Sequence, residues 1–409
     1  MSLKFLQLSV ATATLATSVN SLSMPHSPGD AFSVDAFMPS TPEEFDPVAE
    51  LQRLEAKFPI VSVGDTVEAR SYKQAGSAKV KPSSAGLSFF VPTVIGNQTF
   101  NLIYDTGSAD LWVYSNESSP WQSWGHPTYV PTSSSEFLPN YTWAIKYAQG
   151  DEISGVVFKD TVKAGSVVAH KQAIQAAVFN PLDINTDGIL GLAFPTINTV
   201  KPEEQNTLFE TLIPTLKRKL FAANLRADVQ REDWLHTVTS KNHWAMNVGS
   251  YAVGKGSFMN SKKTVGEVIM DSGTSLVYLP KAVVNDYYSH IKGYELTDGG
   301  SHTFPCNSTI PDFHFKTGGT TLSIPGQDVN YTIYDPNINT CSGGITTQLS
   351  GKYSVLGNLF MKNYYVIHSQ EEATPKLGFA AHQSIIRCSR EELWDVVRLT
   401  QRREEHYAA

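Results

Sequence analysis

Two aspartates in this sequence each follow an apolar segment and precede a hydroxyl residue and a glycine. Asp105 comes after Leu-Ile-Tyr and before Thr-Gly-Ser, and Asp271 comes after Val-Ile-Met and before Ser-Gly-Thr-Ser. A carboxylate at such a turn needs hydrogen-bond donors, which the neighbouring hydroxyl groups supply. Two carboxyl groups in close contact hold one proton between them, because repulsion between two negative charges disfavours ionisation of both. The ionised partner can then take a proton from water while the protonated partner binds the carbonyl under attack.

Each aspartate has a matching companion further along the chain. A Gly-Ile-Leu-Gly sequence ends at Gly191 and a Ser-Val-Leu-Gly sequence ends at Gly357, in each case 86 residues after the aspartate (191 − 105 and 357 − 271). One Asp-Thr-Gly tripeptide can arise by chance, but two copies with companions at equal separation indicate an internal duplication. If the two halves pack as pseudo-symmetric lobes, the two carboxylates meet at the seam between them.

The elements that must position these residues are mostly β-strands. From residue 87 onward, short runs rich in Val, Ile, Phe, Tyr and Thr alternate with clusters of Gly, Asn, Pro and Ser. This spacing is typical of a mainly β protein, and the clearest strands are expected at residues 89–95, 99–104, 141–147 and 156–162. Helices are expected to be few, the clearest at 208–220 and 281–291.

The nine residues from Asp105, Asp-Thr-Gly-Ser-Ala-Asp-Leu-Trp-Val, and the five from Asp271, Asp-Ser-Gly-Thr-Ser, resemble the two active-site signatures of pepsin-like aspartic proteases. The resemblance includes the two companion elements, covers roughly residues 75–380 and is closer to the fungal secreted group of penicillopepsin and aspergillopepsin type. It implies a mainly β, bilobal fold with pseudo-twofold related lobes and a long cleft between them. It also implies an aspartic endopeptidase that hydrolyses peptide bonds in polypeptides at acidic pH.

The resemblance assigns roles to the residues around the aspartates. Asp105 and Asp271 are the catalytic pair that activates the water molecule. Ser108 and Thr274 would orient them, while Thr106 and Ser272 would brace the two loops against each other. The supporting residues are Thr106, Gly107, Ser108, Ser272, Gly273 and Thr274.

A second group of residues is expected to cover and line the cleft. By the resemblance, Tyr147 belongs to a β-hairpin flap that closes over the bound peptide, and Trp112 steadies this tyrosine. The local pattern supports a hairpin, with residues 143–147 and 153–158 joined by a turn. Ile103 and Ile189 are candidates for the pocket of the residue before the cut. The flap and substrate-binding set is therefore Tyr147, Gln149, Gly150, Asp151, Trp112, Ile103 and Ile189.

The chain is expected to fall into five parts. Lys4 precedes an apolar stretch with small residues up to Ser23, as in an export signal. Residues 24–74 are rich in Pro, Ser, Glu and Ala, which indicates a removable leader. The expected parts are a signal peptide (1–23), a pro-segment (24–74), an N-terminal lobe with the first aspartate and the flap (75–222), a C-terminal lobe with the second aspartate (223–380) and a C-terminal extension (381–409).

The sequence departs from the family pattern at several places. The flap reads Tyr-Ala-Gln-Gly-Asp from Tyr147, where the fungal group usually has Tyr-Gly-Asp-Gly-Ser. Gln149 removes an acidic group, so we expect a preference for large apolar residues at the cut and little tolerance for Lys before it. The charged stretch 226–243 is shorter than usual, through either a shortened loop or a lost strand. Ser272 replaces the commoner threonine.

Composition limits the classes of molecule that this protein is expected to bind. The net charge is −7, and no basic stripe suits a nucleic acid. After the signal, no stretch approaches the roughly 18 apolar residues that span a bilayer, so we expect a secreted monomer that binds polypeptides and pepstatin-type inhibitors.

Cys306 and Cys341, 35 residues apart, suit a disulfide in an oxidising compartment, and they match the second-lobe disulfide of the resembled family. The sequons are at Asn97, Asn116, Asn140, Asn307 and Asn330.

Other chemistries gain no support from the sequence. No pair of cysteines has metal-finger spacing, and no serine lies in a Gly-x-Ser-x-Gly elbow. We therefore expect no metal and no cofactor. The alternative is a protease-like protein that binds peptides without cutting them efficiently, which the shortened 226–243 stretch favours and the intact aspartate pair opposes.

Overall fold

The computed structural model describes residues 32–36, 73–83, 88–147, 152–181, 186–225, 234–259, 265–348 and 353–381. Within them, most of the regular structure is β-strand and the helices are short. The predicted signal peptide and C-terminal extension lie outside the described residues, apart from Ala381.

The largest sheet has thirteen strands and runs through the N-terminal lobe and the region between the lobes. Its strands are β1 (Phe32–Ala36), β2 (Ser77–Pro82), β3 (Phe89–Ile95), β4 (Gln98–Asp105), β5 (Leu111–Tyr114), β6 (Glu136–Lys146), β7 (Glu152–Ala164), β8 (Val167–Phe179), β9 (Gly188–Gly191), β10 (Leu220–Asn224), β11 (Trp234–Thr237), β24 (Tyr364–Ser369) and β25 (Lys376–Ala381). Their order is β11-β25-β24-β10-β1-β2-β3-β4-β9-β5-β8-β7-β6, with β3 also pairing with β7.

Three smaller sheets make up the C-terminal lobe. A five-stranded sheet contains β12 (Ala245–Val248), β14 (Gly266–Met270), β23 (Ser354–Leu356), β15 (Val277–Leu279) and β22 (Ile345–Thr347). A three-stranded sheet contains β13 (Ser250–Val253), β18 (Phe313–Thr317) and β19 (Thr320–Ile324), and a four-stranded sheet contains β16 (Glu295–Leu296), β17 (His302–Pro305), β21 (Thr340–Gly343) and β20 (Asn330–Asp335). The helical elements are η1 (Pro195–Ile197), α2 (Leu208–Leu212), α3 (Lys281–Ser289), α4 (Gly326–Val329) and α5 (Asn358–Met361).

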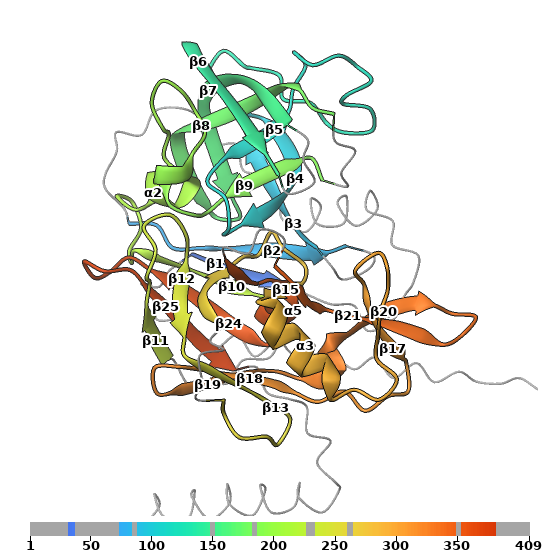
Figure 1. The fold of residues 1–409 in the computed structure, drawn as a ribbon. Helices are drawn as coiled ribbons and strands as arrows, with labels where there is room; N and C mark the ends of the chain where they lie inside the picture. The colour runs from blue at the N-terminus through green and yellow to red at the C-terminus, as the bar shows by residue number, and fades with distance from the viewer. Residues whose placement is uncertain are drawn as a thin grey trace, which may run out of the picture.

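The molecule has two lobes, with a layer of strands between them. Strands β3 to β9 form the upper lobe in Figure 1, the three smaller sheets form the lower lobe, and β2, β1, β10 and β24 lie between. The duplicated sequence elements occupy equivalent places, since β4 pairs in parallel with β9 and β14 pairs in parallel with β23. The predicted mainly β, bilobal fold is confirmed.

One strand comes from the predicted pro-segment. Residues Phe32–Ala36 form β1, which pairs in parallel with β2 on one side and with β10 on the other. Five residues of the expected leader are therefore part of the sheet between the lobes. A strand in this position cannot leave without exposing the hydrogen-bonding edges of both its neighbours.

The helix predicted at residues 208–220 is wrong in its second half. Helix α2 ends at Leu212, because Pro214 cannot donate the backbone hydrogen bond that a continuing helix requires. Residues 220–224 then form β10. Helix α3 lies where the helix 281–291 is expected, and it ends two residues earlier, at Ser289.

The stretch 226–243 contains a strand. Residues Trp234–Thr237 form β11, which pairs antiparallel with β25 at the edge of the thirteen-stranded sheet. Residues 226–233 lie outside the described residues. The strand places the beginning of the second lobe against the last strand of the described chain.

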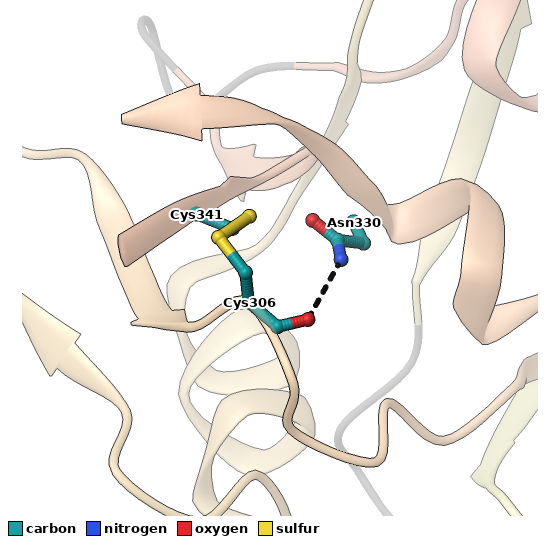
Figure 2. The surroundings of a disulfide bond; sticks show 3 residues. All are labelled: Cys306, Asn330 and Cys341. Carbon is teal, nitrogen blue, oxygen red and sulfur yellow. Dashed lines mark hydrogen bonds between the residues drawn. A yellow bond between two sulfur atoms is a disulfide. The ribbon is translucent and has the colours of Figure 1, made fainter. Parts of the chain in front are cut away.

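The predicted pairing of Cys306 with Cys341 is confirmed. Their sulfur atoms are bonded at 1.99 Å (Figure 2). The bond joins the chain just after β17 to β21, and the side-chain amide of Asn330 donates to the Cys306 carbonyl at 3.5 Å. Cys388 lies outside the described residues.

A histidine lies in the apolar interior between the lobes. His368, on β24, is fully buried, with its ring stacked on Phe221 at a centroid distance of 4.4 Å and edge-on to Trp244 at 5.0 Å. Among the described residues, neither ring nitrogen has a well-formed hydrogen bond. Burial lowers the pKa of His368 to about 3, and the Val366 carbonyl offsets only part of this effect. The ring is therefore neutral through most of the acidic range.

We expect His368 to make folding less favourable in acid. Below a pH of about 6.5 the unfolded chain protonates this histidine, whereas the folded chain does not until its lower pKa is reached. The free energy of unfolding therefore falls by about 1.4 kcal/mol for each pH unit between the two pKa values. The variant His368→Phe keeps an aromatic ring in the stack and removes the titration.

Urea unfolding of wild type and His368→Phe at neutral pH and at about pH 4 checks this expectation. The variant should lose markedly less stability on acidification than the wild type, whatever their difference at neutral pH. His290→Phe, which alters an exposed histidine after α3, serves as the matched control. Equal acid losses in wild type and His368→Phe would rule the expectation out.

Candidate active site

Asp105 and Asp271 lie at corresponding places in the two lobes. Asp105 is the last residue of β4, and Asp271 directly follows β14. The Leu192 N–H donates to the Asp105 carbonyl at 2.7 Å, and the Asp271 N–H donates to the Leu356 carbonyl at 3.1 Å. Each aspartate is thus joined to its companion element, which the sequence repeat predicts.

The turn after β4 holds the carboxylate of Asp105. The Gly107 N–H donates to Oδ1 at 2.8 Å, and the Ser108 hydroxyl donates to Oδ2 at 2.5 Å. The side chain is almost buried, with 7% of the residue exposed. Because both oxygens have a donor, the carboxylate has one preferred orientation.

The turn after β14 holds Asp271 in the same way. The Gly273 N–H donates to Oδ1 at 2.8 Å, and the Thr274 hydroxyl donates to Oδ2 at 2.6 Å. These two bonds correspond, donor for donor, to those of the other lobe. The predicted pseudo-twofold relation therefore extends to the hydrogen bonds of the two carboxylates.

The two aspartate turns are tied together by four reciprocal hydrogen bonds. The Thr106 N–H donates to the Ser272 hydroxyl at 3.1 Å, and the Ser272 N–H donates to the Thr106 hydroxyl at 3.0 Å. The Thr106 hydroxyl donates to the Met270 carbonyl at 2.8 Å, and the Ser272 hydroxyl donates to the Tyr104 carbonyl at 2.5 Å. Each turn is therefore positioned by the opposite lobe, and Ser272 makes these bonds without the methyl group of threonine.

The glycines of both turns lie against the opposite carboxylate. A Cβ atom on Gly107 would lie 2.6 Å from Cγ of Asp271, and one on Gly273 would lie 2.5 Å from Oδ1 of Asp105. Both distances are far below a normal van der Waals contact. Glycine is thus required at both positions by close approach, and the two carboxyl groups meet across the seam.

The contact changes the acidity of the pair. Burial raises the pKa of Asp105, and the charge of Asp271 and a hydrogen bond between the two side chains raise that pKa further. The bonds from Ser108 and Gly107 oppose this rise only in part. The pair therefore retains a proton at pH values where an isolated, solvated carboxyl would have lost it.

The flap strands and the candidate pocket lie on one side of the pair. Strands β6 and β7 form a hairpin that pairs as far as Lys146 and Glu152. Next to it, the fully buried indole of Trp112 donates from Nε1 to the Tyr147 hydroxyl at 2.7 Å. Ile189 pairs with Trp112 on β5 and with Ile103 on β4, and both isoleucines are half-buried.

The Tyr147 hydroxyl stays neutral over the whole useful pH range. Burial raises the pKa of Tyr147 well above its usual value, and the charge of Asp105 adds to this. Gln149, Gly150 and Asp151, the predicted turn of the flap, lie outside the described residues.

Two further polar residues support the aspartate turns, and neither is among the site residues predicted from the sequence. Asp110 is buried, and its Oδ1 accepts from the side chain of Gln175 at 2.7 Å and from the backbone and hydroxyl of Thr199 at 3.0 and 2.8 Å. The Asn358 amide donates to the Ser272 carbonyl at 3.1 Å. A signal was present for Asp110, since it is an acidic residue directly before the apolar run Leu-Trp-Val-Tyr.

The described part of the chain carries neither a metal-binding cluster nor a membrane-spanning helix. No group of three or more His, Cys, Asp or Glu side chains there is arranged to hold a metal ion. None of its helices combines the length and the apolar character needed to span a bilayer.

Comparisons with known proteins agree on one family. Residues 89–382 match the family model described as eukaryotic aspartyl protease. The chain is 37% identical to aspergillopepsin-1 of Aspergillus fumigatus over 339 residues, which cover 78% of this chain and 84% of that protein. It is 36% identical to penicillopepsin-1 of Penicillium janthinellum over 326 residues, which cover 75% of this chain and 98% of that protein.

Proposed function

The chain belongs to the eukaryotic aspartyl protease family and is an aspartic endopeptidase, and we propose that Asp105 and Asp271 together carry out its reaction. The observation that carries this proposal is the meeting of the two carboxyl groups across the seam, each bonded by its own turn and each against the glycine of the other. Its substrates are polypeptides, and it resembles the fungal proteases named above.

The proposed reaction uses the shared proton of the pair. The carboxylate that is ionised removes a proton from a water molecule, and the water oxygen attacks the carbonyl carbon of the peptide bond. The protonated partner donates a hydrogen bond to the carbonyl oxygen, where negative charge develops. The proton that was taken from the water then passes to the leaving nitrogen, and the C–N bond breaks. Both carboxyl groups must be present in opposite protonation states, which favours acidic pH.

The side chains next to the pair favour an apolar residue before the cut. Ile103 and Ile189 are half-buried beside Asp105, and Trp112 and Tyr147 close the same side. Burial of a large apolar side chain there contributes about 1.5–3 kcal/mol to binding. We also propose that peptides with Lys directly before the cut are poor substrates, as predicted from the sequence.

The hydroxyl group of Tyr147 is expected to contribute about tenfold to kcat/KM. The variant Tyr147→Phe keeps the apolar ring but leaves the Trp112 N–H without its acceptor at 2.7 Å. Leaving the N–H of the fully buried Trp112 without its acceptor costs about 1–3 kcal/mol, and about 1.4 kcal/mol of lost transition-state stabilisation corresponds to a tenfold decrease. Steady-state kinetics on one peptide substrate measure the effect.

Tyr141→Phe is the matched control for Tyr147→Phe. Among the described residues, the Tyr141 hydroxyl, on strand β6, bonds only to the exposed Glu203, at 3.3 Å. Its kcat/KM should stay within about twofold of wild type, because an exposed bond of this length contributes little. If Tyr147→Phe behaved like the control, the proposed role of the hydroxyl would be wrong.

A cleavage assay on the purified, processed protein tests the proposed chemistry. We expect hydrolysis of denatured haemoglobin at about pH 3, between the two apparent pKa values usual for aspartic protease pairs. A pepstatin-type inhibitor should abolish it, because such an inhibitor occupies the cleft over the two aspartates. Cleavage that resists the inhibitor, or no cleavage at all, would contradict the proposal and favour a protein that only binds peptides.

The processing and location of the protein are part of the same proposal. An export signal at 1–23, a pro-segment at 24–74 and the disulfide between Cys306 and Cys341 together support a secreted monomeric zymogen whose two lobes span 75–222 and 223–380. Four of the five sequon asparagines, Asn97, Asn116, Asn140 and Asn307, are exposed, and Asn330 is half-buried. Mass spectrometry of the secreted product measures its termini and its glycans.

A further inference from the structure

The chain pairs with Asp105 at the end of β9. Gly191 is the partner of Asp105, and Ile189 lies two residues before this point. The strand ends at Gly191, and Phe194 follows three residues later. The residues after β9 therefore leave the catalytic pair along a part of the chain that is distinct from the apolar pocket.

A histidine, His243, is held against these residues after β9. The Phe194 N–H donates to the Asn242 carbonyl at 3.4 Å, and the indole of Trp244 donates to the Leu192 carbonyl at 2.8 Å. His243 lies between these two anchors in the sequence. Its backbone N–H donates to the Ser240 hydroxyl at 3.2 Å, and its side chain is half-buried.

A second aromatic residue of the C-terminal lobe lies next to this histidine. The rings of His243 and Tyr353 are 6.0 Å apart, and Tyr353 is 45% exposed. Tyr353 directly precedes β23, whose Leu356 carbonyl accepts the Asp271 N–H. The ring pair therefore lies beside the strands that position both catalytic aspartates, and it remains accessible to a ligand.

The charged groups near His243 are carboxylates. Burial lowers the pKa of His243, and the charges of Glu267 and Asp105 partly restore it. Glu267, on β14, already accepts a hydrogen bond from the Thr239 hydroxyl at 2.6 Å. The ring of Tyr353 is the aromatic neighbour of this imidazole. The charges of Glu267 and Asp105 favour the protonated imidazole, and a substrate carboxylate beside the ring would favour it further.

We propose that His243 is a specificity-determining residue that binds a carboxylate side chain of the substrate, Asp or Glu, on the side of the cut opposite the pocket of Ile103 and Ile189. The proposal rests on the proposed function of the same site. A half-buried cation attracts a carboxylate more strongly than a fully solvated one does, and it repels Lys and Arg at that position. The enzyme would thus select an apolar residue before the cut and an acidic residue after it.

Peptide pairs that differ only in Glu or Gln measure this selection. Each pair carries the same large apolar residue before the cut and varies one of the first three positions after it. At about pH 5 the Glu side chain is ionised, since its ordinary pKa is about 4.3. We expect the wild type to show a kcat/KM ratio of about 10 for Glu over Gln at one of these positions, as a charge-assisted bond would give. The ratio should approach 1 at about pH 3, where Glu is protonated.

Variants of His243 assign the ratio to the histidine. The ratio should fall to about 1 in His243→Gln, which has no charge, and should return in His243→Lys, which restores a cation. His290→Gln changes an exposed histidine after α3 and should keep the wild-type ratio. Because ratios are compared within one variant, a change in overall activity or folding does not affect the conclusion.

The outcomes separate this inference from the proposed function. Pepstatin-sensitive cleavage of the Gln peptides with no Glu preference at any position would overturn the inference and leave the protease activity standing. A Glu preference that persists in His243→Gln would also overturn it, by assigning the selection elsewhere. A wild type that cleaves none of the peptides would overturn the proposed function and this inference together.

Discussion

Replacing Asp105 with asparagine is expected to lower kcat by at least about 10³-fold, and the same change at Asp271 should have the same effect. An amide cannot take a proton from water, and it cannot share a proton with the remaining carboxyl. The loss is similar at both positions because the two residues act as a unit, whose individual contributions are not additive. The double variant should therefore be hardly less active than either single variant.

Both substitutions preserve the shape of the side chain, so the fold should remain. At each position the backbone N–H of Gly107 or Gly273 still finds the amide oxygen as acceptor, and the hydroxyl of Ser108 or Thr274 can rotate to accept from the amide NH2 group. Thermal unfolding and kcat on one peptide are measured together. Asp298→Asn, an exposed change in the C-terminal lobe, is the control and should have wild-type kcat. Folded Asp105→Asn protein with wild-type activity would exclude the proposed mechanism.

The second large effect is expected from a single methyl group at the seam. In Gly107→Ala the new Cβ would lie 2.6 Å from Cγ of Asp271, and in Gly273→Ala it would lie 2.5 Å from Oδ1 of Asp105. The opposite carboxyl has to move, because the backbone of each turn is held by the bonds of Thr106 and Ser272. A displacement of about 1 Å at a reacting group costs on the order of 10²-fold in rate.

The pH profile distinguishes this effect from a general loss of structure. Moving the carboxyls apart weakens the charge and hydrogen bond through which Asp271 raises the pKa of Asp105. The pair should then lose its shared proton at a lower pH than in the wild type. The basic limb of the kcat/KM profile should therefore shift to more acidic values. Gly319→Ala is the control, since a Cβ there meets nothing within 4 Å. A wild-type profile in both seam variants would refute the close-contact argument.

Several features of this protein follow from local sequence patterns. The two Asp-Ser/Thr-Gly turns, their companions 86 residues later and the alternation of apolar runs with turn residues predicted the two-lobed β fold. Strand β3 covers the predicted residues 89–95, since its burial alternates strictly along the strand. Such patterns are readable because neighbouring residues in a strand face opposite sides. The disulfide was also predictable, as two cysteines lay in one segment.

Other features depend on contacts between residues far apart in the sequence. The predicted helix 208–220 ends at Leu212, before Pro214, and its last predicted residue, Leu220, begins β10, whose pairing with β24 is not contained in local propensity. The place of β1 between β2 and β10, and the buried position of His368, likewise result from the assembly of the central sheet.

The sequence alone determined which two aspartates could do the chemistry, because a duplicated turn with its own hydrogen-bond donors is a local property. Only the tertiary structure decided how they work together. The bonds between Thr106 and Ser272 join residues 166 apart in the chain, and the placement of His243 next to the residues after β9 depends on bonds between the two lobes. These contacts form when the lobes pack, since the free energy that holds them comes from burying both apolar cores at once.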